Sequence, residues 1–128
     1  MVQWRWVSDA AALAAHREQL AEHGGPDGVR DVTLLESAMG RPKNLATYGE
    51  PDAAALAASY AFGLARNHPF VDGNKRTAAV VCEGFLNLNG MQLDCTNAEM
   101  AVLFQELAAG EISEAGLAAW LRERVSPA

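Results

Sequence analysis

Residues that mark extracellular, membrane-spanning or disordered proteins are scarce in this sequence of 128 residues. Its two cysteines provide neither a disulfide framework nor a cysteine metal cluster, and only five prolines interrupt a chain that contains 25 alanines. No apolar run approaches the roughly 18 residues of a membrane helix, and residues 1–15 lack the apolar stretch of a signal peptide. We therefore expect a single domain over residues 1–128, located in the cytoplasm and without a membrane partner.

Basic residues are also few. The chain has ten lysines and arginines and sixteen aspartates and glutamates, which gives a net charge of −6. A general nucleic-acid-binding protein is expected to be basic, so direct binding of nucleic acid is disfavoured. Residues 66–76 depart from this balance, since they include three basic residues and one acidic residue. A small positive island in an acidic chain suits a small anionic ligand better than a polyanion.

Helix-capping residues and apolar periodicity predict an all-α fold of about six helices with no strong strand. The expected helices cover residues 9–22, 33–39, 53–67, 74–89, 97–109 and 114 onward. Capping-box pairs, Thr33 with Glu36 and Thr96 with Glu99, open two of them. Residues 40–51 are expected to be irregular, with a short extended piece or hairpin near residues 45–48.

One short segment, His-Pro-Phe-Val-Asp-Gly-Asn-Lys-Arg at positions 68–76, gathers residues with separate chemical roles. It leads into a helix N-terminus, where free backbone N–H groups and the helix dipole favour anions. Gly73 allows the backbone to form a concave nest of N–H groups, and Asn74 adds side-chain donors. Lys75 and Arg76 place positive charge where it opposes the helix dipole, which an anionic ligand would explain.

Two further residues of this segment suggest chemistry. Asp72 offers a carboxylate beside the nest, and carboxylates next to phosphates commonly hold Mg²⁺. A histidine titrates near neutrality, which suits His68 to act as a general base. Each also has a structural interpretation, His68 as an ordinary residue after a helix and Asp72 as a helix cap. Phe70 is expected to anchor the loop in the core, so the residues alone indicate a phosphate site with a candidate base.

The segment resembles the signature of the Fic/Doc superfamily, His-x-Phe-x-(Asp/Glu)-Gly-Asn-(Gly/Lys)-Arg, and Asn-Lys-Arg-Thr-Ala at 74–78 is similar to its death-on-curing (Doc) branch. Other stretches that resemble the branch lie at 28–31, 35–38, 41–42, 85–90 and 110–113. The resemblance implies a compact Fic/Doc-like helical bundle with a short flap loop or hairpin around residues 41–50.

The resemblance also implies roles for individual residues. His68 would deprotonate a target hydroxyl, Phe70 would set the loop, and Asp72 would coordinate Mg²⁺. The phosphates of ATP would be bound by Gly73, Asn74, Lys75 and Arg76, the first two of which would form the anion hole. The flap that docks the target would consist of Lys43, Asn44, Leu45, Ala46, Thr47 and Tyr48.

The resemblance implies a bacterial type II toxin that acts as an ATP-dependent protein kinase. Its target would be a Ser/Thr hydroxyl of elongation factor Tu, and phosphorylation of this target would block translation. Its partner would be a Phd-like antitoxin with a disordered tail that folds on the toxin. Lys75 and Ala79 stand where AMP-transferring relatives have Gly and a second Arg, which favours phosphorylation. Asp72-Gly73 is the Fic-type form, so AMP transfer stays open as an alternative, as does a catalytically inactive antitoxin-binding module.

Overall fold

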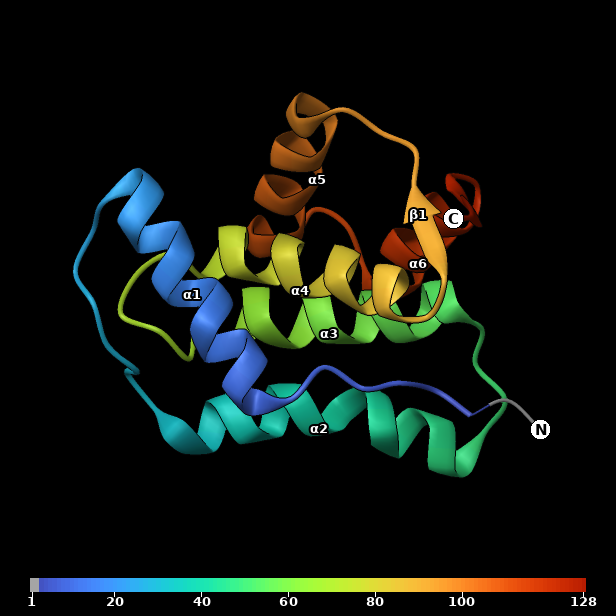
Figure 1. Ribbon diagram of the computed structural model, residues 1–128, viewed down its shortest axis with the longest axis horizontal. Coiled ribbons are helices and arrows are strands. Elements are labelled where there is room, and N and C mark those ends of the chain that lie inside the picture. The colour runs from blue at the N-terminus through green and yellow to red at the C-terminus, as the bar shows by residue number, and fades with distance from the viewer. Residues whose placement is uncertain (1–2) are drawn as a thin grey trace.

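The computed structural model describes residues 3–128, which form a helical bundle (Figure 1). Within this range the elements are α1 (Asp9–His23), α2 (Val32–Tyr48), α3 (Ala53–Asn67), α4 (Asn74–Leu88), β1 (Met91–Leu93), α5 (Asn97–Ala109), α6 (Glu114–Arg122) and β2 (Val125–Pro127). The predicted fold of six helices is confirmed. The two short strands, which the apolar pattern did not predict, pair antiparallel with Gln92 opposite Ser126.

The central helix is α3, which packs against α2, α4 and α6. In Figure 1, α3 and α4 lie side by side across the middle, with α2 along one side and α5 on the other. Small residues make this arrangement possible, because seven of the 15 residues of α3 are alanine and 11 of the 15 are buried. At Gly63, a side chain would place a Cβ only 3.0 Å from the backbone of Ala38, so glycine permits α2 to approach closely.

An aromatic cluster joins the N-terminal segment to the core. The ring of Phe85 lies 5.3 Å from that of Tyr60, 6.0 Å from Trp4 and 5.9 Å from Trp6, measured between centroids. The buried Tyr60 hydroxyl accepts a hydrogen bond from the backbone N–H of Val7 at 3.0 Å. The hydroxyl of Tyr60 also donates a hydrogen bond to the carbonyl oxygen of Val7 at 3.3 Å. Burial raises the pKa of Tyr60 to about 12, so the hydroxyl keeps the proton that this second bond requires.

The two cysteines are free thiols, as their number suggested. Cys82 is fully buried, and burial raises the pKa of its thiol far above the usual range, which makes it an inert core residue. Cys95 is only partly buried. No helix among residues 3–128 is long and apolar enough to cross a membrane.

The largest departure from prediction concerns residues 40–48, which are helical rather than irregular. Pro42 lacks an N–H group and so removes one backbone bond of the helix, which is why the sequence pattern suggested an end there. Its ring is fully buried, however, and α2 continues past it to Tyr48 because the helix keeps one face on the core. The predicted flap loop or hairpin at 41–50 is therefore wrong: residues 43–48 form the last turns of α2, with only residues 49–50 outside the helix.

The start of α2 also differs from prediction, since it lies one residue before Thr33. The side chain of Asp31 caps the helix and accepts a hydrogen bond from the backbone N–H of Leu34 at 3.0 Å. The predicted capping box of Thr33 with Glu36 is wrong, because the N-cap residue is Asp31 and Thr33 lies inside the first turn of the helix. The predicted capping box of Thr96 with Glu99 is confirmed at the start of α5, and the side chains of Ser8, Asp52 and Ser113 cap α1, α3 and α6.

Candidate active site

A groove of about 930 Å³ lies where α3 ends and α4 begins, bordered by α1 on one side and α5 on the other. In Figure 1 the loop that joins α3 to α4 is the yellow-green connection beside α1. The groove brings together the predicted site residues His68, Asp72, Gly73, Asn74, Lys75 and Arg76. Phe70 does not line the groove, and its side chain is fully buried, as an anchor of the loop would be.

Asn74 closes the loop on itself. Its side-chain oxygen accepts a hydrogen bond from the backbone N–H of Phe70, and its side-chain nitrogen donates to the carbonyl oxygen of Phe70, both at 3.0 Å. The side chain of Asn74 is buried and holds the loop, where the sequence suggested donors aimed at the ligand. What Asn74 offers to an anion is its backbone N–H group.

The start of α4 leaves its backbone donors free. Gly73 occupies the N-cap position with φ +78°, and no side chain caps the helix. Asp72, the alternative cap suggested by the sequence, instead accepts a hydrogen bond from the backbone N–H of Gly73 at 2.8 Å. Free N–H groups at the positive end of a helix dipole make a site for a negatively charged group.

Two cations flank these donors. Lys75 and Arg76 are exposed, and neither has a carboxylate partner among residues 3–128. The ammonium group of Lys75 donates a hydrogen bond at 2.9 Å to the side-chain oxygen of Gln105 on α5. Gln105 therefore orients Lys75 along the groove, a role that nothing in the sequence near residue 75 indicated.

The carboxylate of Asp72 lies against the turn that follows α1. A Cβ at Gly25 would come within 2.6 Å of Oδ2 of Asp72, so glycine leaves the room that this carboxylate occupies. In the described part of the chain, no three His, Cys, Asp or Glu side chains are grouped to hold a metal ion. A single carboxylate beside a phosphate site fits Mg²⁺, which keeps several waters and takes one or two carboxylates together with phosphate oxygens.

His16 supports the loop from α1 and was not identified from the sequence. Its ring stacks on Phe70, with 3.9 Å between centroids and 8° between planes, and its Nε2 lies 2.8 Å from the carbonyl oxygen of Asp72. A carbonyl oxygen only accepts hydrogen bonds, so Nε2 of His16 carries a proton. The available signal was a histidine on the apolar face shared with Leu13 and Leu20.

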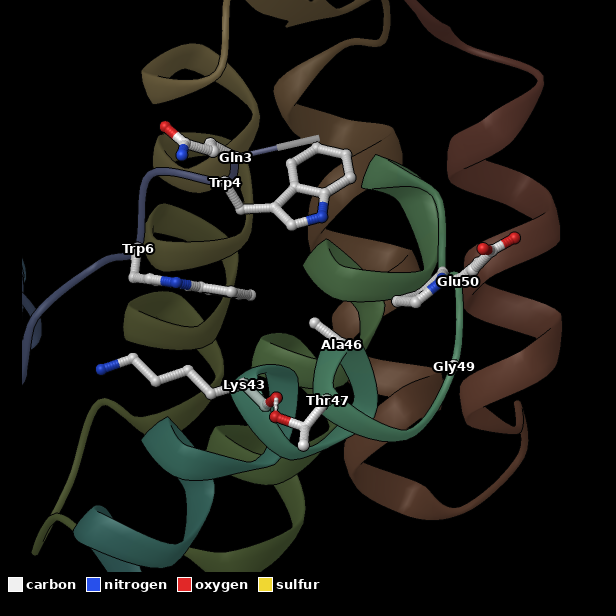
Figure 2. A pocket seen from close by; sticks show the side chains of 9 residues that line it. Gln3, Trp4, Trp6, Lys43, Ala46, Thr47, Gly49 and Glu50 are labelled. Carbon is white, nitrogen blue, oxygen red and sulfur yellow. Dashed lines mark hydrogen bonds between the residues drawn. The ribbon is translucent and has the colours of Figure 1, made fainter. Parts of the chain in front are cut away.

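The predicted flap residues do not line this groove. Lys43, Ala46 and Thr47 line a different pocket of about 960 Å³, which they share with Trp4 and Trp6 of the N-terminal segment (Figure 2). Their neighbour Tyr48 is 88% exposed at the end of α2. The structure thus assembles the residues of the 68–76 segment, and it places the predicted docking segment on a separate surface.

Comparison with known proteins is consistent with this site. The Fic/DOC family model matches residues 6–86, a stretch that includes the whole of the 68–76 loop. Protein kinase doc of Escherichia phage P1 is 35% identical over 119 residues, which cover 92% of this chain and 94% of that protein. Toxin Doc of Mycolicibacterium smegmatis is 47% identical over 73 residues, or 55% of each chain.

Proposed function

Because the chain belongs to the Fic/DOC family, we propose that it is the toxin of a bacterial toxin–antitoxin pair and a protein kinase that uses ATP. The observation that carries the proposal is the exposed His68 beside the uncapped, positively charged start of α4, in one groove. The phage relative that covers most of the chain is itself named a protein kinase, which supports phosphate transfer.

In the proposed reaction, the hydroxyl oxygen of a serine or threonine attacks the γ-phosphorus of ATP, and ADP leaves. His68 takes the proton of that hydroxyl as the new O–P bond forms. The free N–H groups at the start of α4, with Lys75 and Arg76, bind the phosphates and stabilise the charge that develops on them. Mg²⁺, held by Asp72 and phosphate oxygens, would neutralise part of the phosphate charge.

Two residues favour phosphate transfer over AMP transfer. The side chain of Lys75 fills the position where a glycine would let a phosphate approach the backbone, and Gln105 holds it there. Ala79 lines the same groove one turn later and supplies no second cation. Asp72-Gly73 supports the alternative of AMP transfer, and the position of the label decides between the two reactions.

The test uses the purified protein with Mg²⁺, a bacterial extract, and ATP labelled at either the γ or the α position. Protein label from γ-labelled ATP alone, lost in His68→Ala, is the expected result. His23→Ala removes another imidazole from the same groove and should keep the label, which makes it a matched control. Label from the α position would establish AMP transfer, and no protein label from either would contradict catalysis.

We further propose a threonine of elongation factor Tu as the target, a Phd-like antitoxin as the partner, and the cytoplasm as the location. The support for inhibition in trans is that the chain lacks the pattern (Ser/Thr)-x-x-x-Glu-(Gly/Asn) of self-inhibited Fic proteins. Its one Glu-Gly pair, Glu83-Gly84, has Ala79 four residues before the glutamate. Purified elongation factor Tu should accept the γ label, and an antitoxin tail peptide should prevent it. If the labelled protein in the extract is not elongation factor Tu, the proposed target is wrong, whereas the proposed kinase activity still holds.

A further inference from the structure

The candidate base has an unusual backbone. His68 adopts φ +51° and ψ +56°, and it is the sole non-glycine residue in the range 3–128 with a positive φ. An L-residue in this region is strained and persists there only when its surroundings enforce the conformation. The side chain of His68 makes no hydrogen bond to any described residue, so its direction depends on how its backbone is held.

Arg30 holds that backbone from the turn between α1 and α2. Its Nε donates a hydrogen bond to the carbonyl oxygen of His68 at 2.7 Å, and its Nη2 donates to the carbonyl oxygen of Asn67 at 2.9 Å. These two carbonyls belong to the peptide planes on either side of the Cα of His68. One rigid, planar guanidinium that binds both planes therefore sets their relative orientation, which is defined by φ and ψ of His68.

The position of Arg30 is itself fixed. The backbone N–H groups of Arg30 and Asp31 both donate to the carbonyl oxygen of Pro69, at 2.7 and 3.1 Å. The backbone N–H of Val71 donates to the carbonyl oxygen of Gly28 at 3.1 Å. The turn thus runs along the loop as a short backbone pairing, and the guanidinium needs little reorganisation to reach the end of α3.

From this geometry we infer that Arg30 is a positioning residue that aims the imidazole of His68 into the groove, an inference that rests on the proposed role of His68 as the base. The phosphate-binding groups lie at the start of α4, and Arg30 contacts none of them. Loss of the clamp should therefore slow the chemical step and leave ATP binding unchanged.

The first test compares Arg30→Lys and Arg30→Gln with wild type in phosphate transfer. Both are expected to lower kcat roughly 10- to 100-fold, because misplacement of a reacting group has about this effect, with little change in KM for ATP. Lysine keeps the charge but has no planar fork, so it should not rescue kcat. Arg122→Lys and Arg122→Gln, which disrupt a two-bond clamp on Asp52 away from the groove, are the matched controls.

A rise in KM with kcat unchanged, wild-type kcat in both Arg30 variants, or rescue by lysine would each overturn the inference. A second measurement does not depend on activity. With histidine labelled by ¹³C and ¹⁵N, the backbone shifts and HN–Hα coupling of His68 should report a left-handed conformation in wild type. They should move toward averaged values in Arg30→Gln.

The two measurements separate the two proposals. If His68→Ala and wild type both fail to transfer phosphate, the proposed function fails, and the backbone signals of His68 alone decide whether Arg30 is a clamp. Unchanged left-handed signals in a folded Arg30→Gln would then overturn the clamp. A changed conformation without any loss of transfer in an active enzyme would overturn the positioning role while leaving the kinase intact.

Discussion

The two central helices begin in opposite ways although they pack against each other. The first turn of α3 is capped by Asp52, which accepts a hydrogen bond from the backbone N–H of Ala55 at 2.9 Å and forms an ion pair with Arg122. The first turn of α4 has no side-chain cap and no acidic residue, and it includes Lys75 and Arg76. One helix start satisfies a donor with its own side-chain cap, whereas the other has no side-chain cap.

The difference separates two kinds of sequence signal. Among the described helices, the N-termini of α1, α2, α3, α5 and α6 carry a Ser, Thr or Asp cap, and each cap contributes to stability. At α4 the local rules of stability are broken by glycine at the cap and by cations against the dipole. Such a conflict between local stability and sequence is expected where residues are selected for a function.

The largest effect is expected for Asn74→Ala, which opens the loop in front of α4. The N–H and carbonyl groups of the buried Phe70 would both lose their partner, at about 1–3 kcal/mol for each unsatisfied group. Urea denaturation should show a loss of about 2–4 kcal/mol, accompanied by loss of phosphate transfer. Asn87→Ala, on an exposed position of the same helix, is the control. A loss below about 1 kcal/mol would show that the loop closes without Asn74.

A smaller effect is expected for Asp52→Ala, which leaves α3 uncapped. Loss of an N-cap costs about 1 kcal/mol, and the half-exposed ion pair with Arg122 adds at most about 0.5 kcal/mol. Thermal and urea denaturation should both show the loss. The rate of phosphate transfer should stay at the wild-type level at 25 °C, since Asp52 does not line the groove. A large drop in that rate would mean that the two helix starts are not independent.

Lys75→Glu is expected to raise the free energy of unfolding, because it places a negative charge at the positive end of the α4 dipole. An acidic residue in the first turn of a helix is worth about 0.3–1 kcal/mol relative to no charge, and the variant also removes an unfavourable cation. The unfolding midpoint should therefore rise while ATP affinity falls. Lys43→Glu, toward the C-terminal end of α2, should be neutral or slightly destabilising. Equal midpoints for Lys75→Glu and wild type would show that the dipole does not explain the local conflict.

The smallest effect concerns the pH dependence of the capped end. The hydrogen bond from Arg122 is the main reason that the pKa of Asp52 lies below its ordinary value of 3.8. A lowered pKa in the folded state stabilises the protein above the ordinary value and loses this contribution as the pH falls through the folded-state pKa. The stability gap between wild type and Asp52→Asn, a few tenths of a kcal/mol, should be constant from pH 7 to 5 and shrink below about pH 4. A gap that widens in acid would contradict this assignment.

Local signals were enough to predict most of the helices and the residues that meet in the groove. A cap and its helix lie within a few residues of each other, as do the members of the 68–76 segment, so their relation is visible in the sequence. Residues 40–48 were misassigned because Pro42 is a local signal for a helix end, whereas the burial that overrides it comes from tertiary packing.

The supporting residues of the site could not be predicted for a related reason. His16 contacts a residue 56 positions away, and Arg30 contacts two residues 37 and 38 positions away. Nothing in one sequence links such positions, because the contact depends on how α1 and its following turn fold back over α4. The sequence therefore predicted the residues that line the groove and the buried Phe70, and it missed His16 and Arg30, which contact the loop from α1 and from the turn that follows it.

The stacking of His16 on Phe70 gives the protein a natural spectroscopic reporter. The proton on Nε2 of the buried His16 is hydrogen-bonded to the carbonyl oxygen of Asp72 and shielded from water, so it should exchange slowly enough to be observed by NMR. The carbonyl group that accepts this proton belongs to Asp72, the proposed metal ligand, and the imidazole that carries it is stacked on the ring of Phe70. Its resonance should shift when a nucleotide enters the groove, without any label attached to the site.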